Sequence, residues 1–244
     1  MFKYLIAAVG LILVFIFGFV VYSTLKPPAE ASAPITALPI QVDPTTAPAN
    51  PAATDPAPAA TQASRGGAAI YQFVPADSQV SFTINEVLRN SPNTVVGTTD
   101  QIAGQISFDP SQPAGAQVGP IQVDARTLVT DNNFRNRAIK NQILDTNNYE
   151  YITFTPKSIS GLPDQVTFGT SYNLKITGDL TIKGVTKSVS FDATVTPVDA
   201  TKLQGSATTT ILYKDYGISI PQVPSVASVE DSVILKIDFV AVAG

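Results

Sequence analysis

The stretch YNLKITGDLTIKGVTKSVSF, residues 172–191, limits the fold of this chain more than any other. Apolar residues take alternate positions within it, at Tyr172, Leu174, Ile176, Leu180, Ile182, Val189 and Phe191. A period of two puts these side chains on one face of an extended strand and the polar ones on the other. Gly184-Val185-Thr186 interrupts the pattern and predicts a tight turn. The stretch therefore predicts two half-buried antiparallel strands.

Similar alternation continues through the C-terminal three quarters of the chain. It predicts strands over 70–74, 80–84, 95–108, 118–125, 151–159, 166–168, 172–182, 187–196, 203–213 and 233–240. Gly97 and Gly104 fall inside one of these segments, where glycine is typical of a bulge or a sharp bend. Residues 132–144 depart from the alternation: Phe134, Ala138, Ile139, Ile143 and Leu144 follow helical spacing. They predict one amphipathic helix, with Asp131 or Asn132 at its N-cap.

About eight antiparallel strands and one short helix favour an all-β, lipocalin-like barrel over residues 68–244. Closing a sheet on itself removes its exposed edges, and a barrel of eight strands has room for side chains or for one small ligand. A sandwich of two open sheets is the alternative that the pattern leaves.

The N-terminal residues 4–22, YLIAAVGLILVFIFGFVVY, contain no charged side chain. A helix of this length spans about 30 Å, the thickness of the hydrocarbon core of a bilayer. Residues 1–25 therefore predict a transmembrane anchor that places the C-terminal domain outside the cytoplasm at the cell membrane. A cleaved signal peptide, which would leave a secreted or periplasmic protein, is the alternative, although the apolar run is long for one.

Residues 26–67 are rich in proline, alanine and threonine, and 9 of the 19 prolines of the chain fall between Pro27 and Pro58. Such a composition predicts a disordered linker, since it offers too little apolar surface to fold. Fully extended, about 40 residues could hold the domain as far as roughly 120 Å from the membrane.

The composition removes several classes of chemistry. The chain has no histidine and no cysteine, which excludes disulfides, thiolate nucleophiles, histidine acid–base catalysis and the common zinc sites. No spacing of the carboxylates indicates a glycosidase pair. A net charge of −4 gives no electrostatic footprint for nucleic acid. We therefore predict no catalytic residue, no metal, no cofactor and no nucleic-acid partner.

Several motifs occur in the order typical of one protein family. They are DSQVSF at 77–82, GQISFDP at 104–110, YEYITF at 149–154, GDLTIKGVT at 178–186 and YGI at 216–218, where the family often has FGI. Together they make residues 70–243 resemble the YceI-like family, whose members form a lipocalin-like barrel around an isoprenoid lipid. The helix departs from the family pattern: Ala138 or its neighbour stands where a histidine is usual, and Ile143 and Leu144 replace two aromatic residues.

The resemblance implies non-enzymatic binding, storage or transport of an isoprenoid-type apolar lipid, such as a quinone or a polyprenyl carrier. The candidate lipid-binding residues are those on the apolar face of the barrel: Val80, Phe82, Ile84, Phe154, Leu174, Ile176, Leu180, Ile182, Phe191, Leu235, Ile237 and Phe239. Each could equally be ordinary packed core.

Arg135, Arg137 and Lys140 on the helix are candidates to meet a polar head group, unless they form only a solvated helix face. The alternative function is a membrane-tethered interaction or structural module of the cell envelope with a filled barrel. The sequence leaves open whether two domains pair as a homodimer.

Overall fold

The alternating runs of residues 172–191 form a long β-hairpin. β9 (Tyr172–Ile182) pairs antiparallel with β10 (Val185–Pro197), in a register that runs from Tyr172 opposite Val195 to Ile182 opposite Val185. Lys183 and Gly184 connect the strands with φ angles of 51° and 75°. Positive φ at both central residues is what a two-residue type I′ turn needs. The predicted hairpin is confirmed, and its turn is centred just before the predicted position.

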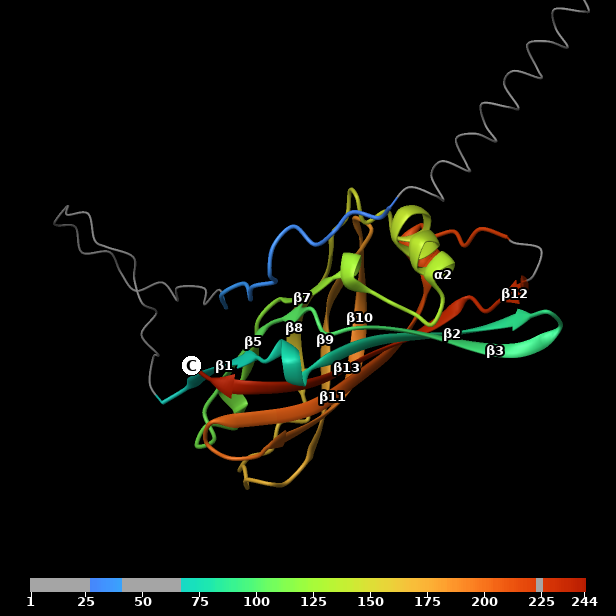
Figure 1. Ribbon diagram of the computed structural model, residues 1–244. Helices are drawn as coiled ribbons and strands as arrows, with labels where there is room; N and C mark the ends of the chain where they lie inside the picture. Colours follow the sequence, from blue (N-terminus) through green and yellow to red (C-terminus); the bar gives the residue numbers. More distant parts are fainter. Residues whose placement is uncertain (1–26, 41–66, 223–225) are drawn as a thin grey trace, which may run out of the picture.

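The computed structural model describes residues 27–40, 67–222 and 226–244, and an antiparallel sheet of thirteen strands dominates them (Figure 1). The remaining strands are β1 (Ala69–Phe73), β2 (Gln79–Leu88), β3 (Ser91–Thr99), β4 (Ile102–Ala103), β5 (Gln105–Phe108), β6 (Gln117–Val118), β7 (Ile121–Asp124), β8 (Tyr151–Ser160), β11 (Lys202–Leu212), β12 (Val226–Val229) and β13 (Ser232–Ala243).

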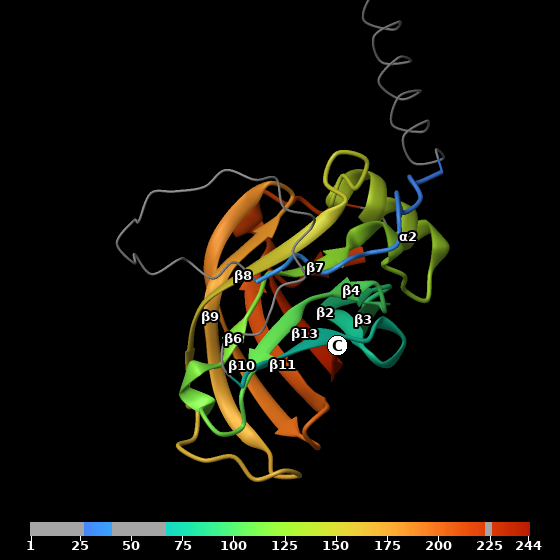
Figure 2. The ribbon, with the colours of Figure 1, turned by 90° about the vertical axis from the view of Figure 1, so that its left-hand side faces the viewer.

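Bends divide some long runs of chain into several short strands. The 3₁₀ turn η1 (Pro75–Asp77) separates β1 from β2, and Gly104 separates β4 from β5. If the interrupted strands are joined as β1–β2, β3–β5 and β6–β7, the described residues contain eight main runs, with β12 added beside β2. Each run pairs with the next, and β13 pairs back to both β1 and β2. The strongly curled sheet is thus consistent with the predicted lipocalin-like barrel (Figure 2).

The predicted helix is present, and it changes character along its length. α2 (Asn133–Ala138) continues into the π-helical turn η4 (Ile139–Ile143). The side-chain Oδ1 of Asn132 accepts hydrogen bonds from the backbone N–H groups of Phe134 and Arg135, which confirms the predicted N-cap. Ile139 is buried, but 77% of Phe134 is exposed, so Phe134 does not belong to the apolar face on which the sequence placed it.

Two strand predictions need correction. Residues 166–168 are not a strand: they lie in the loop between β8 and β9, where Val166 packs against the core and Gly169 donates its N–H to the carbonyl of Pro197. β12 was not predicted, because Val226 and Val229 alone are too few apolar residues to show a period. β12 exists through its pairing with β2, a contact between segments far apart in the sequence.

The described N-terminal segment 27–40, which is part of the predicted linker, contains no helix or strand. It lies along the outside of the domain, with Ile40 buried (Figure 1). The predicted anchor at residues 4–22 and linker residues 41–66 lie outside the described residues. Within the described ranges, no helix has both the length and the apolar character needed to cross a bilayer.

The core fills the inside of the curled sheet with aliphatic and aromatic side chains. Phe154 and Phe191 meet edge to face, with ring centroids 4.9 Å apart, and Phe73 stacks on Phe239 at 5.0 Å. Tyr216 is 1% exposed, and its hydroxyl has no hydrogen-bond partner among the described residues. Burial, with a smaller contribution from Asp215, raises the pKa of Tyr216 to about 12. This hydroxyl is an uncompensated polar group in the core.

Gly178 provides the first test of the fold, because β8 approaches it closely at a bulge between Pro156 and Ser158. A Cβ on Gly178 would lie 2.4 Å from the carbonyl oxygen of Thr155 and 2.7 Å from Cα of Pro156, and backbone atoms cannot easily yield. We expect Gly178→Ala to lower the free energy of unfolding by about 1–3 kcal/mol in urea denaturation. The control Gly115→Ala meets no atom within 4 Å and should change it by less than about 0.5 kcal/mol. Equal stability of the two variants would contradict this packing.

Tyr216 provides the second test. We expect Tyr216→Phe to raise the free energy of unfolding by about 1 kcal/mol at neutral pH, because it removes a buried hydroxyl without a partner. Because folding raises the pKa of Tyr216, its ionisation does not affect the stability of the parent protein below pH 10. Between pH 10 and about 12, the phenol ionises more readily in the unfolded chain, so the parent protein loses stability as the pH rises. The advantage of the variant should therefore grow between these pH values. A variant that is less stable than the parent would show that the hydroxyl has a partner.

Candidate functional site

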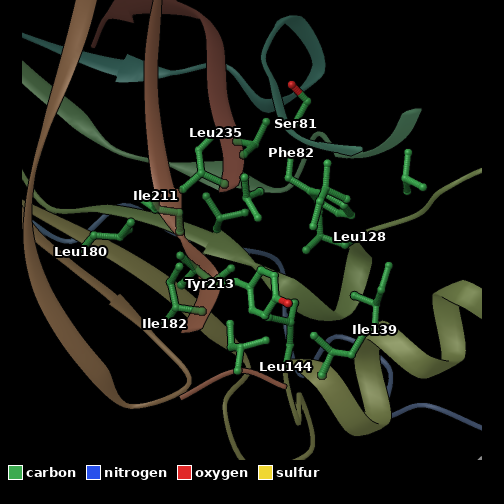
Figure 3. Close-up of a pocket in the computed structure, with 18 of the residues that line it drawn as sticks. Ser81, Phe82, Leu128, Ile139, Leu144, Leu180, Ile182, Ile211, Tyr213 and Leu235 are labelled. Atoms are coloured by element: carbon green, nitrogen blue, oxygen red, sulfur yellow. The ribbon is translucent and has the colours of Figure 1, made fainter. Parts of the chain in front are cut away.

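The barrel holds an apolar cavity of about 210 Å³, covered on one side by the helix. Leu180 and Ile182 of β9, Leu235 of β13 and Ile211 of β11 point into it from the sheet (Figure 3). Ile139 and Leu144 line it from the helical segment. The alternation of each strand explains the lining, since the same phase that buries one residue buries the residue two positions later. We call this space the main cavity.

The walls of the main cavity are almost entirely hydrocarbon. Among its lining residues the polar side chains are Ser81, Glu86, Arg135 and the phenol of Tyr213. Tyr213 directs its hydroxyl to Asp231, at 3.4 Å. An interior with so few hydrogen-bonding groups favours an apolar occupant, because an unpaired polar group there would lose its hydration without compensation.

A second cavity of about 80 Å³ lies toward the opposite end of β9. Leu174 and Ile176, near the start of that strand, line it together with Phe239 of β13. Ile121 and Ile237 line both cavities and so stand at the boundary between them. The inside of the barrel therefore holds two apolar spaces, separated by side chains rather than by backbone.

The structure places all twelve candidate lipid-binding residues inside the barrel. Those that line the main cavity are Val80, Phe82, Ile84, Phe154, Leu180, Ile182, Phe191, Leu235 and Ile237. The other three, Leu174, Ile176 and Phe239, line the second cavity. Their position is therefore as expected, while their role in holding a ligand stays a prediction.

Sequence reasoning missed more than half of the residues that line the main cavity. These are Ser81, Glu86, Val95, Ile121, Val123, Leu128, Ile139, Ile143, Leu144, Ile152, Ile211, Tyr213, Ile218, Ile220, Val229 and Val233. Several had a usable signal: Ile121 and Val123 alternate within a predicted strand, and Val233 lies two residues before Leu235. Ile218 and Ile220 follow the last turn of a 3₁₀ helix, η5 (Tyr213–Tyr216), where no strand period marks them.

Only one of the three head-group candidates reaches the main cavity. Arg135 lines it and forms an ion pair with Glu86, whose Oε1 lies 3.2 Å from Nη2 of Arg135. Arg137 and Lys140 line neither the main nor the second cavity. Ile139, four residues after Arg135, shares its helix face, whereas Arg137 lies on another. Arg135 also pairs with Asp131, so two carboxylates already compensate its charge.

A polar cluster around Arg126 connects the end of the helical segment to the sheet. Nε of Arg126 donates to the carbonyl of Thr146 just after η4, and Nη1 of Arg126 lies 2.9 Å from Glu150. Asp124 is 1% exposed and accepts the N–H of Arg126, and burial raises the pKa of this carboxyl. Burial also lowers the pKa of Lys140, against the opposing effect of Asp124. Through Arg126, this cluster joins the segment after η4 to the start of β8. The described residues contain no group of acidic side chains suited to a metal ion.

Comparison with known proteins identifies the family. The model of the YceI-like domain matches residues 71–241. A UPF0312 protein of Staphylococcus aureus strain MSSA476 is 27% identical over 162 residues, which cover 62% of this chain and 84% of the relative. A UPF0312 protein of Shewanella sp. strain ANA-3 is 30% identical over 152 residues, which cover 58% and 73% respectively.

Solved structures share the fold at lower identity. BcnA of Burkholderia cenocepacia superposes with a TM-score of 0.54 at 22% identity, covering 69% of this chain and 98% of BcnA. A polyisoprenoid-binding domain from Saccharophagus degradans, implicated in plant cell wall breakdown, superposes with a TM-score of 0.57 at 15% identity, covering 72% and 99%. The family match spans well over half of the sequence and coincides with the curled sheet described above. The chain belongs to the YceI-like family.

Proposed function

We propose that the barrel binds an isoprenoid-type apolar lipid, such as a quinone or a polyprenyl carrier, without enzymatic activity, and stores or carries it. The observation that supports this most is the main cavity, which is lined by hydrocarbon from the sheet and the helix. Burying the methyl-branched surface of such a lipid there would contribute roughly 25 cal/mol for each Å² removed from water. The solved polyisoprenoid-binding domain with the same fold supports the choice of ligand class.

The dimensions of the two cavities suggest how a long chain would fit. Each, at about 210 and 80 Å³, is smaller than the pockets of roughly 300–1,000 Å³ that hold drug-sized ligands. A long isoprenoid would therefore have to occupy both spaces, and the side chains of Ile121 and Ile237 would have to turn aside. Aliphatic side chains at a boundary can change rotamer without breaking any hydrogen bond.

We further propose that residues 4–22 anchor the chain in the cell membrane, with the barrel outside the cytoplasm. The support is the length and uniform apolar character of that segment. A lipid carrier held at a membrane would have its ligand reservoir within reach. Cleavage of the segment, which would give a secreted or periplasmic protein, is the alternative.

A second candidate function is an envelope interaction module, in which the outer surface of the barrel binds another protein. Ile234 of β13 and Val96 of β3 both face outward opposite Thr83 of β2, and they are 44% and 47% exposed. Leu212 at the end of β11 is exposed nearby. Such a surface would also suit the homodimer that the sequence left open, and pairing stays a prediction.

The contents of the natively purified protein distinguish the two functions. We expect organic extraction followed by mass spectrometry to recover about one isoprenoid lipid per chain. An extract without apolar lipid, together with no saturable binding of quinone or polyprenyl probes, would favour the interaction module.

Filling the main cavity should reduce the lipid content. Ile182 is 4% exposed and points into this cavity, so Ile182→Trp should occupy the space of the ligand and lower the recovered lipid several-fold. Overpacking typically costs about 1–3 kcal/mol, and circular dichroism can verify that the fold survives. The control Ser188→Trp adds the same side chain at an exposed position of the paired strand β10. Unchanged lipid in a folded Ile182→Trp protein would place the ligand elsewhere.

A further inference from the structure

The described N-terminal segment 27–40 is attached to the barrel at two separate points. At the first, the backbone N–H and the hydroxyl of Ser32 each donate to Glu150, at 2.7 Å. Nη1 of Arg126 donates to the hydroxyl of Ser32 at 2.7 Å and to the carbonyl of Glu30 at 3.1 Å. Burial tends to raise the pKa of Glu150, but the hydrogen bonds from Ser32 and the charge of Arg126 lower it overall, so Glu150 accepts these bonds as an anion.

The second attachment is apolar and depends on a glycine. Ile40 is 8% exposed and lies over Gly119, between β6 and β7. A Cβ on residue 119 would come within 2.9 Å of Cγ1 of Ile40, and the carbonyl oxygen of Leu38 would lie 3.8 Å away. Gly119 thus leaves the space that the segment occupies. We call residues 27–40 the strap.

The strap begins at the end of the barrel that the helix covers. Its first residues lie beside the helical segment in both views (Figures 1 and 2). The contacts agree, because Arg126 binds Glu30 and also the carbonyls of Thr146 and Asn147, which follow η4. The N-terminal end of the strap therefore lies next to the helix.

The attachment shortens the tether between the domain and the uncharged N-terminal segment. Only eight residues lead from Tyr22, the end of that segment, to Glu30, the first hydrogen-bonded residue of the strap. Fully extended, they reach at most about 29 Å, far less than the roughly 120 Å available to a free linker of about 40 residues.

The same end of the barrel carries exposed aromatic side chains. Phe134 is 77% exposed on α2, and Tyr149 is 40% exposed directly before Glu150, which holds the strap. Arg137 follows Phe134 by one helical turn. Aromatic and basic side chains together are typical of surfaces that lie at the interface of a bilayer.

We propose that the strap holds the helix-covered end of the barrel against the bilayer, and that Phe134 and Tyr149 contact the lipid surface. This inference rests on the membrane anchor proposed above. Arg135, Ile139 and Leu144 line the main cavity from the helical segment, so this arrangement places the helix-covered side of the main cavity at the membrane. An apolar ligand could then move between bilayer and barrel without crossing water.

A disulfide tests the strap itself, and the absence of native cysteine makes the result unambiguous. In the full chain, Ile40→Cys with Gly119→Cys should form an intramolecular bond under mild oxidation, since the two Cβ atoms are within bonding reach. Ile40→Cys with Gly115→Cys is the matched control and should stay reduced, because no atom lies within 4 Å of a Cβ at Gly115. If both pairs oxidise equally, or if neither does, the attachment of Ile40 at Gly119 is contradicted.

Fluorescence quenching tests the orientation. The full chain is reconstituted into vesicles of phosphatidylcholine and phosphatidylglycerol that contain nitroxide-labelled lipid, with one fluorophore on Phe134→Cys or on Gln165→Cys. Gln165 is exposed in the loop between β8 and β9, at the other end of the barrel. We expect quenching at position 134 to exceed that at 165 several-fold. Equal quenching in vesicle-bound protein would overturn the orientation and leave the anchor standing.

Failure of the chain to float with the vesicles would overturn both the anchor and the orientation. The lipid recovered by extraction measures binding inside the barrel separately from either result.

Discussion

The pairing of β13 with both β1 and β2 joins the last strand of the domain to the first, and the other features depend on this contact. Because of this pairing, each main run of strand has a neighbouring strand on both of its sides. The alternation of apolar and polar residues then has one consequence along each of them: one set of side chains faces inward and the other faces solvent. Gly104 and the bulge opposite Gly178 bend the strands so that this ring can form. The apolar cavities follow from the geometry.

Local patterns predicted the parts of this fold that depend on local chemistry. The β9–β10 hairpin, the cap of α2 at Asn132 and the inward phase of the candidate residues all follow from spacing over a few positions. Contacts between distant segments were beyond such reasoning. β12 is a strand only because β2 lies beside it, and Ser32 is held by Glu150, which lies 118 residues further along the chain.

The inward direction of the candidate residues was predictable from the sequence, but more than half of the lining of the main cavity and its open volume were not. Period two identifies which side chains point inward, but not whether they fill the space between them. The structure adds that the aliphatic residues Ile143 and Leu144 line the main cavity from the end of the helical segment. Arg137 was assigned to the site because it shares a helix with Arg135, and the helix rotation directs the two side chains differently.

The central claim is that the apolar interior of the barrel takes up one apolar chain. Calorimetric titration of protein stripped of lipid with a soluble short-chain quinone, repeated at several temperatures, tests it most directly. We predict saturation at one quinone per chain with a negative heat-capacity change, the signature of apolar surface leaving water. Heats that do not saturate, or saturable binding with no heat-capacity change, would contradict the account.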